Sequence, residues 1–222
     1  MTRLTHLADE ICAGAEIYFT GRQGGQYLKT AFILCDDYTE LASKLYLVSR
    51  DPDWSERRDG RFKTYGAVLE DVGNAAVDRP TAGEILVLHE RMMERRDRRN
   101  RFFHSAELLD LNITARMAVE AFCDLFQYCE ALFDHEWVLA ARGARNLTTL
   151  VILFKLELAA FANPDVTRRI GTILEEWPRN ATSGRKRGVH QASYPEDLHL
   201  RLCVIVGGTQ LRERLAQLLA EC

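Results

Sequence analysis

Three residues of types that suit phosphodiester cleavage lie close together in the chain: Arg99, Asn100 and His104. A histidine can act as general base towards the 2′-hydroxyl of RNA, or as general acid towards the leaving oxygen. An arginine can stabilise charge that develops on the phosphate, and an asparagine can orient either group. Histidine chemistry needs no metal ion, and the sequence carries no recognisable set of metal ligands. We therefore expect a metal-independent endoribonuclease without a cofactor.

The spacing distributes these three residues unevenly around a helix. Asn100 and His104 are four residues apart, so they share one face. Arg99 and His104 are five residues apart, which separates them by about 140° around the helix axis. Because one straight helix does not bring this pair together well, the sequence predicts either a local kink or a homodimer in which two such segments face one cleft.

The segment that leads to His104 is rich in arginine. Six arginines occur within residues 91–101, against two acidic residues. Such an excess suits phosphate groups, so we expect Arg95, Arg96 and Arg101 to contact RNA. A charge run of this kind is also typical of a solvated helix face, and the pattern leaves both interpretations open.

The apolar stripe of the same segment continues into this charge. Ile85, Leu88 and Met92 recur at steps of three and four residues, and the same steps then reach Arg95 and Arg99. Charged groups on a core-facing stripe are unfavourable unless they are paired or functional. The alternative is that the helix extends past the bundle and leaves both arginines in solvent.

Apolar periodicity also predicts the elements that position these residues. The expected helices cover residues 4–19, 27–48, 61–76, 84–104, 115–133, 146–160 and 164–177, with a last helix capped by Thr209. Thr81 and Glu84 fit a capping box that opens the helix carrying the arginines. The helices at 27–48 and 115–133 have the longest stripes, so we expect them at the centre of an antiparallel bundle.

Acidic residues occur on the first of these long helices. Asp36 and Asp37 lie opposite its expected apolar stripe. This stripe consists of Tyr27, Ala31, Leu34, Tyr38, Leu41, Leu45 and Val48. This position favours the surface for both carboxylates, and it leaves open that they orient Arg95 or Arg99.

The pattern of apolar and polar residues changes after Arg142. We therefore divide it into a helical bundle at 1–142 and a C-terminal helical extension at 143–222, with a basic loop at 178–193. Residues 198–206 alternate as in a strand but also follow a helix-start pattern. A helix is favoured there, because a lone strand in an all-helical context has no partner. Residues 50–60 are expected to form a polar loop.

The string RNRFFH, from Arg99 to His104, resembles the signature of the HEPN superfamily. That signature is an arginine, commonly followed by a polar residue such as asparagine, and a histidine five positions after the arginine. The context agrees, since the motif ends a helix late in a bundle and precedes another long apolar helix. The resemblance covers about residues 5–140. It implies an all-α, HEPN-like bundle of four to five helices, which dimerises so that two motifs face each other.

The resemblance also implies roles and partners. Arg99 and His104 are the implied catalytic pair, with Asn100 in support. The implied protein is a metal-independent ribonuclease that serves as a toxin, an antiphage effector or an RNA-processing enzyme. Its partners would be RNA, a second copy of the chain, and an antitoxin or regulatory protein. Ala106 stands where toxins paired with a nucleotidyltransferase antitoxin often carry a modified tyrosine, so neutralisation at that position is not expected.

The amino-acid composition indicates the cellular compartment but not the function. The net charge of −3 gives no global sign of a nucleic-acid binder, so any such role depends on local basic groups. No run of eighteen apolar residues or CxxC pair occurs, so we expect a cytoplasmic protein with reduced thiols and no membrane association. The alternative functions are a non-catalytic helical module that binds RNA or nucleotide, or a structural partner in a complex.

Overall fold

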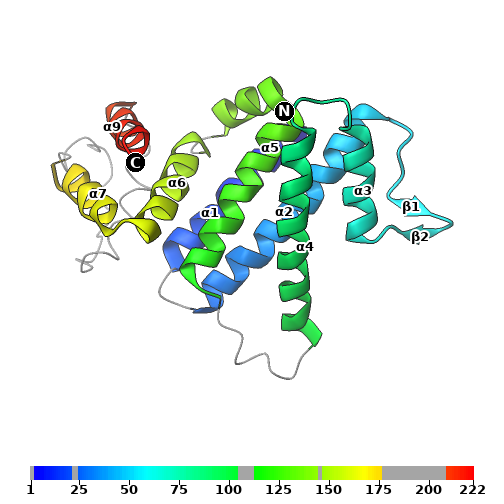
Figure 1. Ribbon diagram of the computed structural model, residues 1–222, viewed down its shortest axis with the longest axis horizontal. Coiled ribbons are helices and arrows are strands. Elements are labelled where there is room, and N and C mark those ends of the chain that lie inside the picture. Colours follow the sequence, from blue (N-terminus) through cyan, green and yellow to red (C-terminus); the bar gives the residue numbers. More distant parts are fainter. Residues whose placement is uncertain (1–2, 22–24, 105–112, 145–146, 177–208) are drawn as a thin grey trace.

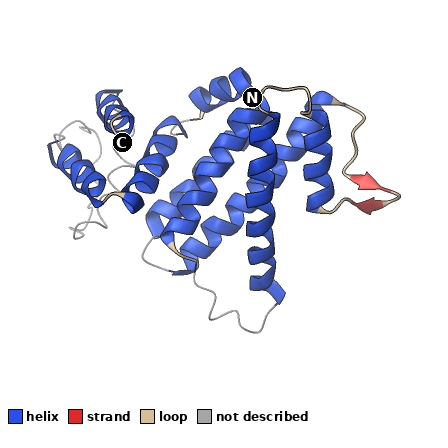
Figure 2. Cartoon of the chain, in the orientation of Figure 1, coloured by secondary structure: helices blue, strands red, loops and turns tan. Residues whose placement is uncertain are grey.

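This computed structural model describes residues 3–21, 25–104, 113–144, 147–176 and 209–222. The described residues are mostly helical, which confirms the all-α prediction (Figure 2). The helices are α1 (Arg3–Gly21), α2 (Gly25–Arg50), α3 (Tyr65–Ala75), α4 (Ala82–His104), α5 (Ala115–Gly143), α6 (Leu147–Ala162), α7 (Pro164–Glu176) and α9 (Thr209–Ala220). Within these ranges the strands are β1 (Arg57–Arg58) and β2 (Arg61–Phe62), which form an antiparallel hairpin.

Helices α1, α2 and α5 pack against one another at the centre of the molecule (Figure 1). The predicted stripe of α5 is confirmed, because Val119, Phe122, Phe126 and Cys129 are all fully buried. These apolar side chains recur at three- and four-residue steps and turn one face of α5 into the core.

The predicted stripe of α2 is partly wrong. Tyr27 and Leu41 are 48% and 40% exposed, whereas Phe32 and Thr39, which were outside the stripe, are fully buried. The buried face is rotated and wide because α2 packs against α1, α3, α4 and α5. This width carries Asp36 into the interior, at 5% exposure, so the prediction of a surface position was wrong for this residue.

Helix α4 lies across α2 and α5 and begins at Ala82, directly after Thr81 (Figure 1). The predicted capping box does not form. The Thr81 hydroxyl donates to the carbonyl of Ala131 at 3.0 Å, and Glu84 accepts a hydrogen bond from Gln127 at 2.7 Å. Both side chains therefore attach the start of α4 to α5, rather than satisfying the amides of their own helix.

A kink divides α5 at Asp134, whose backbone has φ 47° and ψ −124°. Positive φ is unfavourable for a residue with a side chain, and the surroundings hold it in place. Arg79 donates to the carbonyl of Leu132 at 2.8 Å and to the Asp134 carboxylate at 2.6 Å. The part of α5 before this kink is the part that faces α4 in the candidate site.

The segment between α2 and α3 is more ordered than a polar loop. Its residues 57–62 form the β1–β2 hairpin, and α3 begins only at Tyr65 rather than near residue 61. Thr64 caps α3, since its hydroxyl accepts a hydrogen bond from the amide of Ala67. The sequence prediction missed the hairpin because its strands have two residues each, too few to show an alternating pattern.

Helix α6 packs on α5 and α1, and α7 and α9 pack on α6 (Figure 1). The predicted start of α7 is confirmed, with the Asn163 side chain accepting a hydrogen bond from the amide of Asp165 at 3.0 Å. The predicted basic loop at 178–193 and the ambiguous segment at 198–206 lie outside the described residues. Within the described residues, no helix combines the length and the apolar character needed to span a bilayer.

Candidate active site

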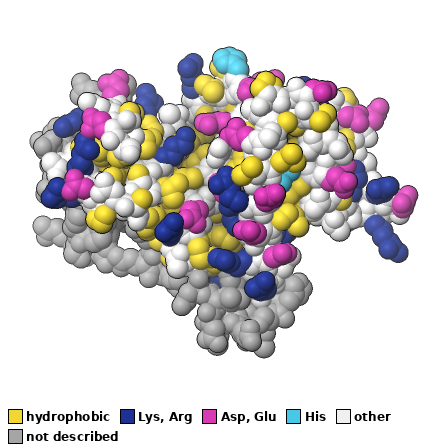
Figure 3. Space-filling model, viewed as in Figure 1, with side chains coloured by type: hydrophobic (Ala, Val, Ile, Leu, Met, Phe, Trp, Pro, Cys, Tyr) yellow, Lys and Arg dark blue, Asp and Glu magenta, His cyan; other side chains and the backbone are white. Residues whose placement is uncertain are grey.

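The two halves of α4 differ in how they meet the bundle. Ile85, Leu88 and Met92 in the first half are at most 1% exposed and pack in the core. The second half carries the arginines, and Figure 3 shows basic and acidic side chains intermingled over this region. Arg99 and Asn100 therefore lie on a segment that is attached to the bundle through charged groups.

The guanidinium of Arg99 lies against the carboxylates of α2. Its Nη2 is 2.9 Å from Oδ1 of Asp37, and its Nε is 3.4 Å from Oδ2 of Asp36. The Arg99 side chain is 21% exposed, and its Nε is buried. Two ion pairs to one helix fix the side-chain conformation, which is the kind of support that a charge-stabilising group requires.

Arg96 makes the firmest connection between α4 and α2. Its guanidinium donates to Asp36 at 2.6 Å and to Glu40 at 2.7 Å. The same group lies 4.6 Å from the ring centroid of Tyr65, in a cation–π contact. These carboxylates raise the pKa of Arg96 against the effect of its burial. Arg96 is thus a link between three helices.

Asp36 is shared by Arg96 and Arg99. Burial raises the pKa of the Asp36 carboxyl above its ordinary value, although hydrogen bonding and charge from the two arginines oppose this rise. A buried carboxylate of this kind is stabilised only by its partners. The position of Arg99 is therefore coupled to that of Arg96 through one shared acid.

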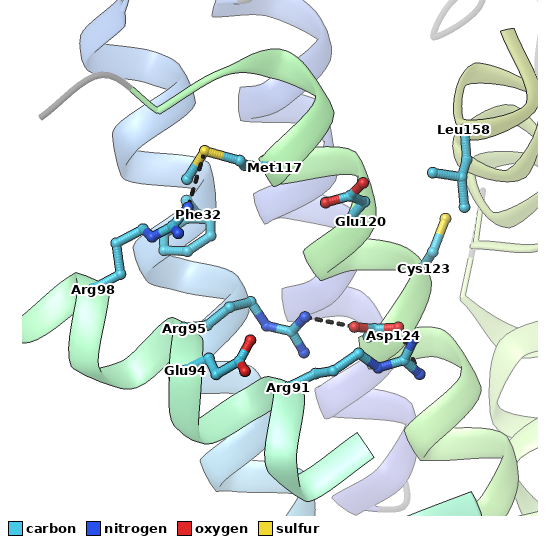
Figure 4. Close-up of a pocket in the computed structure, with 10 residues that line it drawn as sticks. All are labelled: Phe32, Arg91, Glu94, Arg95, Arg98, Met117, Glu120, Cys123, Asp124 and Leu158. Carbon is cyan, nitrogen blue, oxygen red and sulfur yellow. Dashed lines mark hydrogen bonds and ion pairs between the residues drawn. The ribbon is translucent and has the colours of Figure 1, made fainter. Parts of the chain in front are cut away.

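A second acid, Asp124 of α5, holds the other side of α4 (Figure 4). Its carboxylate lies 2.5 Å from Nη1 of Arg95 and 3.2 Å from Nη2 of Arg91. Arg95 and Arg99 are thus paired rather than solvated, which decides between the two interpretations of the charged stripe. The arginines of α4 divide between α2 and α5 and hold the helix across both.

A pocket of about 460 Å³ opens beside Asp124, between α4 and α5. Its charged lining consists of Arg91, Arg95, Arg98, Glu94, Glu120 and Asp124. The three acids of this lining equal its three arginines in number. One Arg98 nitrogen donates to the sulfur of Met117 at 3.3 Å. This balance of charge does not favour a phosphate, and we do not assign the pocket to RNA.

Two of the remaining predicted residues lie on the solvent side of α4. Asn100 and Arg101 are exposed. His104 is the last residue of α4, and its side chain lies outside the part of the structure that is described. Within the chain, Arg99 is therefore brought together with acids of α2, while its juxtaposition with His104 stays a prediction.

Arg95 and Arg96 have a structural role that the sequence did not reveal. Their side chains are 16% and 18% exposed, and both are occupied by carboxylates. Their predicted contact with RNA stays a prediction, since a phosphate must compete with these acids. Arg101, the third arginine predicted to contact RNA, is exposed at the surface of α4.

The sequence interpretation missed Glu40 and Asp124 as members of the site. One signal was present for each of them. Asp36 and Glu40 are four residues apart and lie on one helix face. Asp124 interrupts an otherwise apolar run of α5, where a charge requires a partner.

The described residues contain no group of three or more histidine, cysteine, aspartate or glutamate side chains arranged to hold a metal ion. Comparison with protein-family models, curated proteins and solved structures found no match. A function for this chain is therefore argued from its own residues and from the motif at the end of α4.

Proposed function

We propose that this protein is a metal-independent endoribonuclease of the HEPN type. The observation that carries the proposal is the fixed Arg99 guanidinium, held by Asp36 and Asp37 on the last turns of α4, five residues before His104. Asn100 is exposed beside it. An arginine held in one conformation suits the stabilisation of a phosphate, which would share this 21% exposed guanidinium with Asp37.

In the proposed reaction, one His104 imidazole removes the proton of a 2′-hydroxyl, and the 2′-oxygen attacks the adjacent phosphorus. The bond from phosphorus to the 5′-oxygen breaks, and that oxygen takes up a proton from a second acid. The products are a 2′,3′-cyclic phosphate and a 5′-hydroxyl. Arg99 stabilises the charge on the phosphate during the attack, and Asn100 orients His104 or the substrate.

The site is proposed to form between two copies of the chain. Arg99 and His104 are about 140° apart around α4, so one copy cannot direct both at one phosphate without a distortion. A two-fold dimer that apposes the ends of two α4 helices supplies Arg99 of one copy and His104 of the other to each cleft. The resemblance to HEPN proteins supports a role as a toxin or antiphage effector in the cytoplasm, restrained by an antitoxin or regulatory protein.

Single-turnover cleavage of a 5′-labelled RNA, in the presence of EDTA, tests this proposal. Arg99→Ala and His104→Ala should each lower the rate by about 10²- to 10⁴-fold. The matched controls are Arg142→Ala and His135→Ala, which remove an exposed arginine and an exposed histidine of α5. The controls should cleave at the wild-type rate.

Two outcomes would overturn the proposal. Full activity of His104→Ala would place the chemistry elsewhere, and loss of wild-type activity in EDTA, with rescue by a divalent ion, would show that the reaction depends on metal. A wild-type protein that binds RNA without cleaving it would favour the alternative, a non-catalytic binding module.

A further inference from the structure

The β1–β2 hairpin projects from the bundle at the end where α3 lies (Figure 1). In its register, Arg57 pairs with Phe62 and Arg58 pairs with Arg61. Asp59 and Gly60 connect the strands with φ values of 53° and 77°. Positive φ at both central residues is typical of a tight two-residue turn, for which Asp-Gly is a favoured sequence.

The base of this hairpin is attached to α3. Lys63 lies 2.7 Å from Asp71, and the indole nitrogen of Trp54 donates to the same carboxylate at 2.9 Å. The Lys63 ammonium also lies 4.7 Å from the Trp54 ring centroid. Isolated two-stranded hairpins are marginally stable, so these contacts explain how a short hairpin holds its shape.

The hairpin exposes an aromatic ring. Phe62 is 61% exposed, and the Arg57 guanidinium lies 4.2 Å from its ring centroid. Residues of this size and apolarity are normally buried. An exposed ring beside an arginine is the arrangement on which unpaired nucleic-acid bases stack.

The charge of the hairpin is positive and largely uncompensated. Among the described residues, no carboxylate lies within ion-pair distance of the guanidinium groups of Arg57, Arg58 or Arg61. Glu56 lies 3.3 Å from Lys44, so its charge is already paired. Asp59 is the acidic residue within 57–62, and Arg58 also interacts electrostatically with Asp71 of α3. Figure 3 shows basic and acidic side chains at that edge of the molecule.

The hairpin differs in this respect from α4, whose arginines Arg91, Arg95, Arg96 and Arg99 are paired with acids. A depression of about 440 Å³ lies between the hairpin and the start of α3, and it is lined by Arg58, Asp59, Arg61, Phe62, Lys63, Thr64 and Ala67. Basic and aromatic groups thus line one open surface.

We propose that this hairpin binds single-stranded RNA at a distance from the cleavage site. A base stacks on Phe62, and Arg58 and Arg61 contact phosphates. The inference rests on the proposed function, because it names RNA as the ligand. It identifies the substrate as RNA with an unpaired stretch, since the rings in a duplex are already stacked.

Binding is measured by fluorescence anisotropy with a labelled oligouridylate of about 12 nucleotides. All measurements use full-length protein that carries His104→Ala, so that cleavage does not interfere. Phe62→Ala should weaken binding about tenfold. Arg58→Ala with Arg61→Ala should also weaken it, and should reduce the slope of log K against log salt by about 1.4, because each phosphate contact contributes about 0.7. A duplex of the same length should bind more weakly than the single strand.

The controls are Phe161→Ala, which removes an exposed phenylalanine of α6, and Arg142→Ala. Both should bind like the parent, and thermal unfolding should show that all variants are folded. Unchanged affinity of Phe62→Ala and of the double arginine variant would overturn the inference, as would the absence of any RNA binding. Cleavage by protein with an intact His104 is a separate readout. If that protein does not cleave RNA but binding still depends on Phe62, the proposed function fails while the binding surface stands.

Discussion

Arg99 of α4 and Asp37 of α2 form an ion pair, with 2.9 Å between Nη2 and Oδ1. They are 62 residues apart in the chain, so the contact exists only in the folded protein. Asp37 is 47% exposed, so the pair contributes little to stability, about 0–1 kcal/mol. The effect of this ion pair is to orient the Arg99 side chain.

Asp37→Asn should therefore lower the cleavage rate only because Arg99 loses its orientation. We expect a single-turnover rate about tenfold lower, an unchanged thermal midpoint, and RNA affinity equal to or above that of the wild type because one negative charge is lost. In an Arg99→Ala background, Asp37→Asn should have no further effect on the rate. Independent, multiplicative losses would show that Asp37 does not act by positioning Arg99.

A dimeric site predicts complementation between inactive chains. When Arg99→Ala and His104→Ala proteins are mixed and allowed to exchange, half of the dimers are mixed, and each mixed dimer has one site with both groups intact. The mixture should recover about a quarter of wild-type activity, as two-fold symmetry requires. If the pair acts within one chain, the mixture should stay as inactive as its components, and light scattering would then be checked for a monomer.

Asp124 should matter for stability more than the exposed acids do. Asp124→Ala leaves Arg95 without its partner in a site where that side chain is 16% exposed, and should lower the free energy of unfolding by about 3 kcal/mol. Arg91→Ala removes a more exposed partner and should cost less than about 1 kcal/mol. Urea unfolding measures both changes.

Replacement of both members of the pair provides the control. Arg95→Leu combined with Asp124→Leu removes the charges together and should be less destabilising than Asp124→Ala alone. Equal losses in both proteins would mean that packing, rather than an unpaired arginine, causes the effect.

His89 predicts a loss of stability in acid. Burial lowers the pKa of His89 to about 4, from an ordinary value of 6.5, and its ring lies 3.1 Å from the Tyr128 hydroxyl at 8% exposure. Below pH 6.5 the unfolded chain takes up a proton at this position that the folded protein resists. The free energy of unfolding should therefore fall between pH 6.5 and 4, by about 3 kcal/mol from this residue.

Urea unfolding at several pH values measures this slope. His89→Gln should be less stable at neutral pH but should lose less stability between pH 6.5 and 4. His135→Gln, which changes an exposed histidine, should keep the full slope. An unchanged slope in His89→Gln would show that other groups carry the acid sensitivity.

The sequence predicted the elements well because helices are encoded locally. Steps of three and four residues were enough to place α2 and α7 to within a few residues, and to place the part of α5 that precedes the kink at Asp134. The faces were harder to predict. Phe32 and Thr39 of α2 are buried because four helices surround α2, and that number of neighbours cannot be read from one helix alone.

The partners of the arginines depend on contacts between distant segments. Arg96 meets Asp36 across 60 residues, and Arg95 meets Asp124 across 29. The sequence could show that Arg95 and Arg99 required partners or a function, because they continue an apolar stripe. It could not show which acids would meet them, since that depends on the angle at which α4 crosses α2 and α5.

The two halves of α4 are attached to the bundle by contacts whose strengths depend differently on temperature. Contacts of the first half, through Ile85 and Leu88, weaken on cooling, as apolar burial does. The ion pairs of the second half gain on heating, because the hydration that competes with them becomes less favourable. Because apolar stabilisation levels off at high temperature, warming strengthens the attachment of the end that carries Arg99 relative to that of the first half.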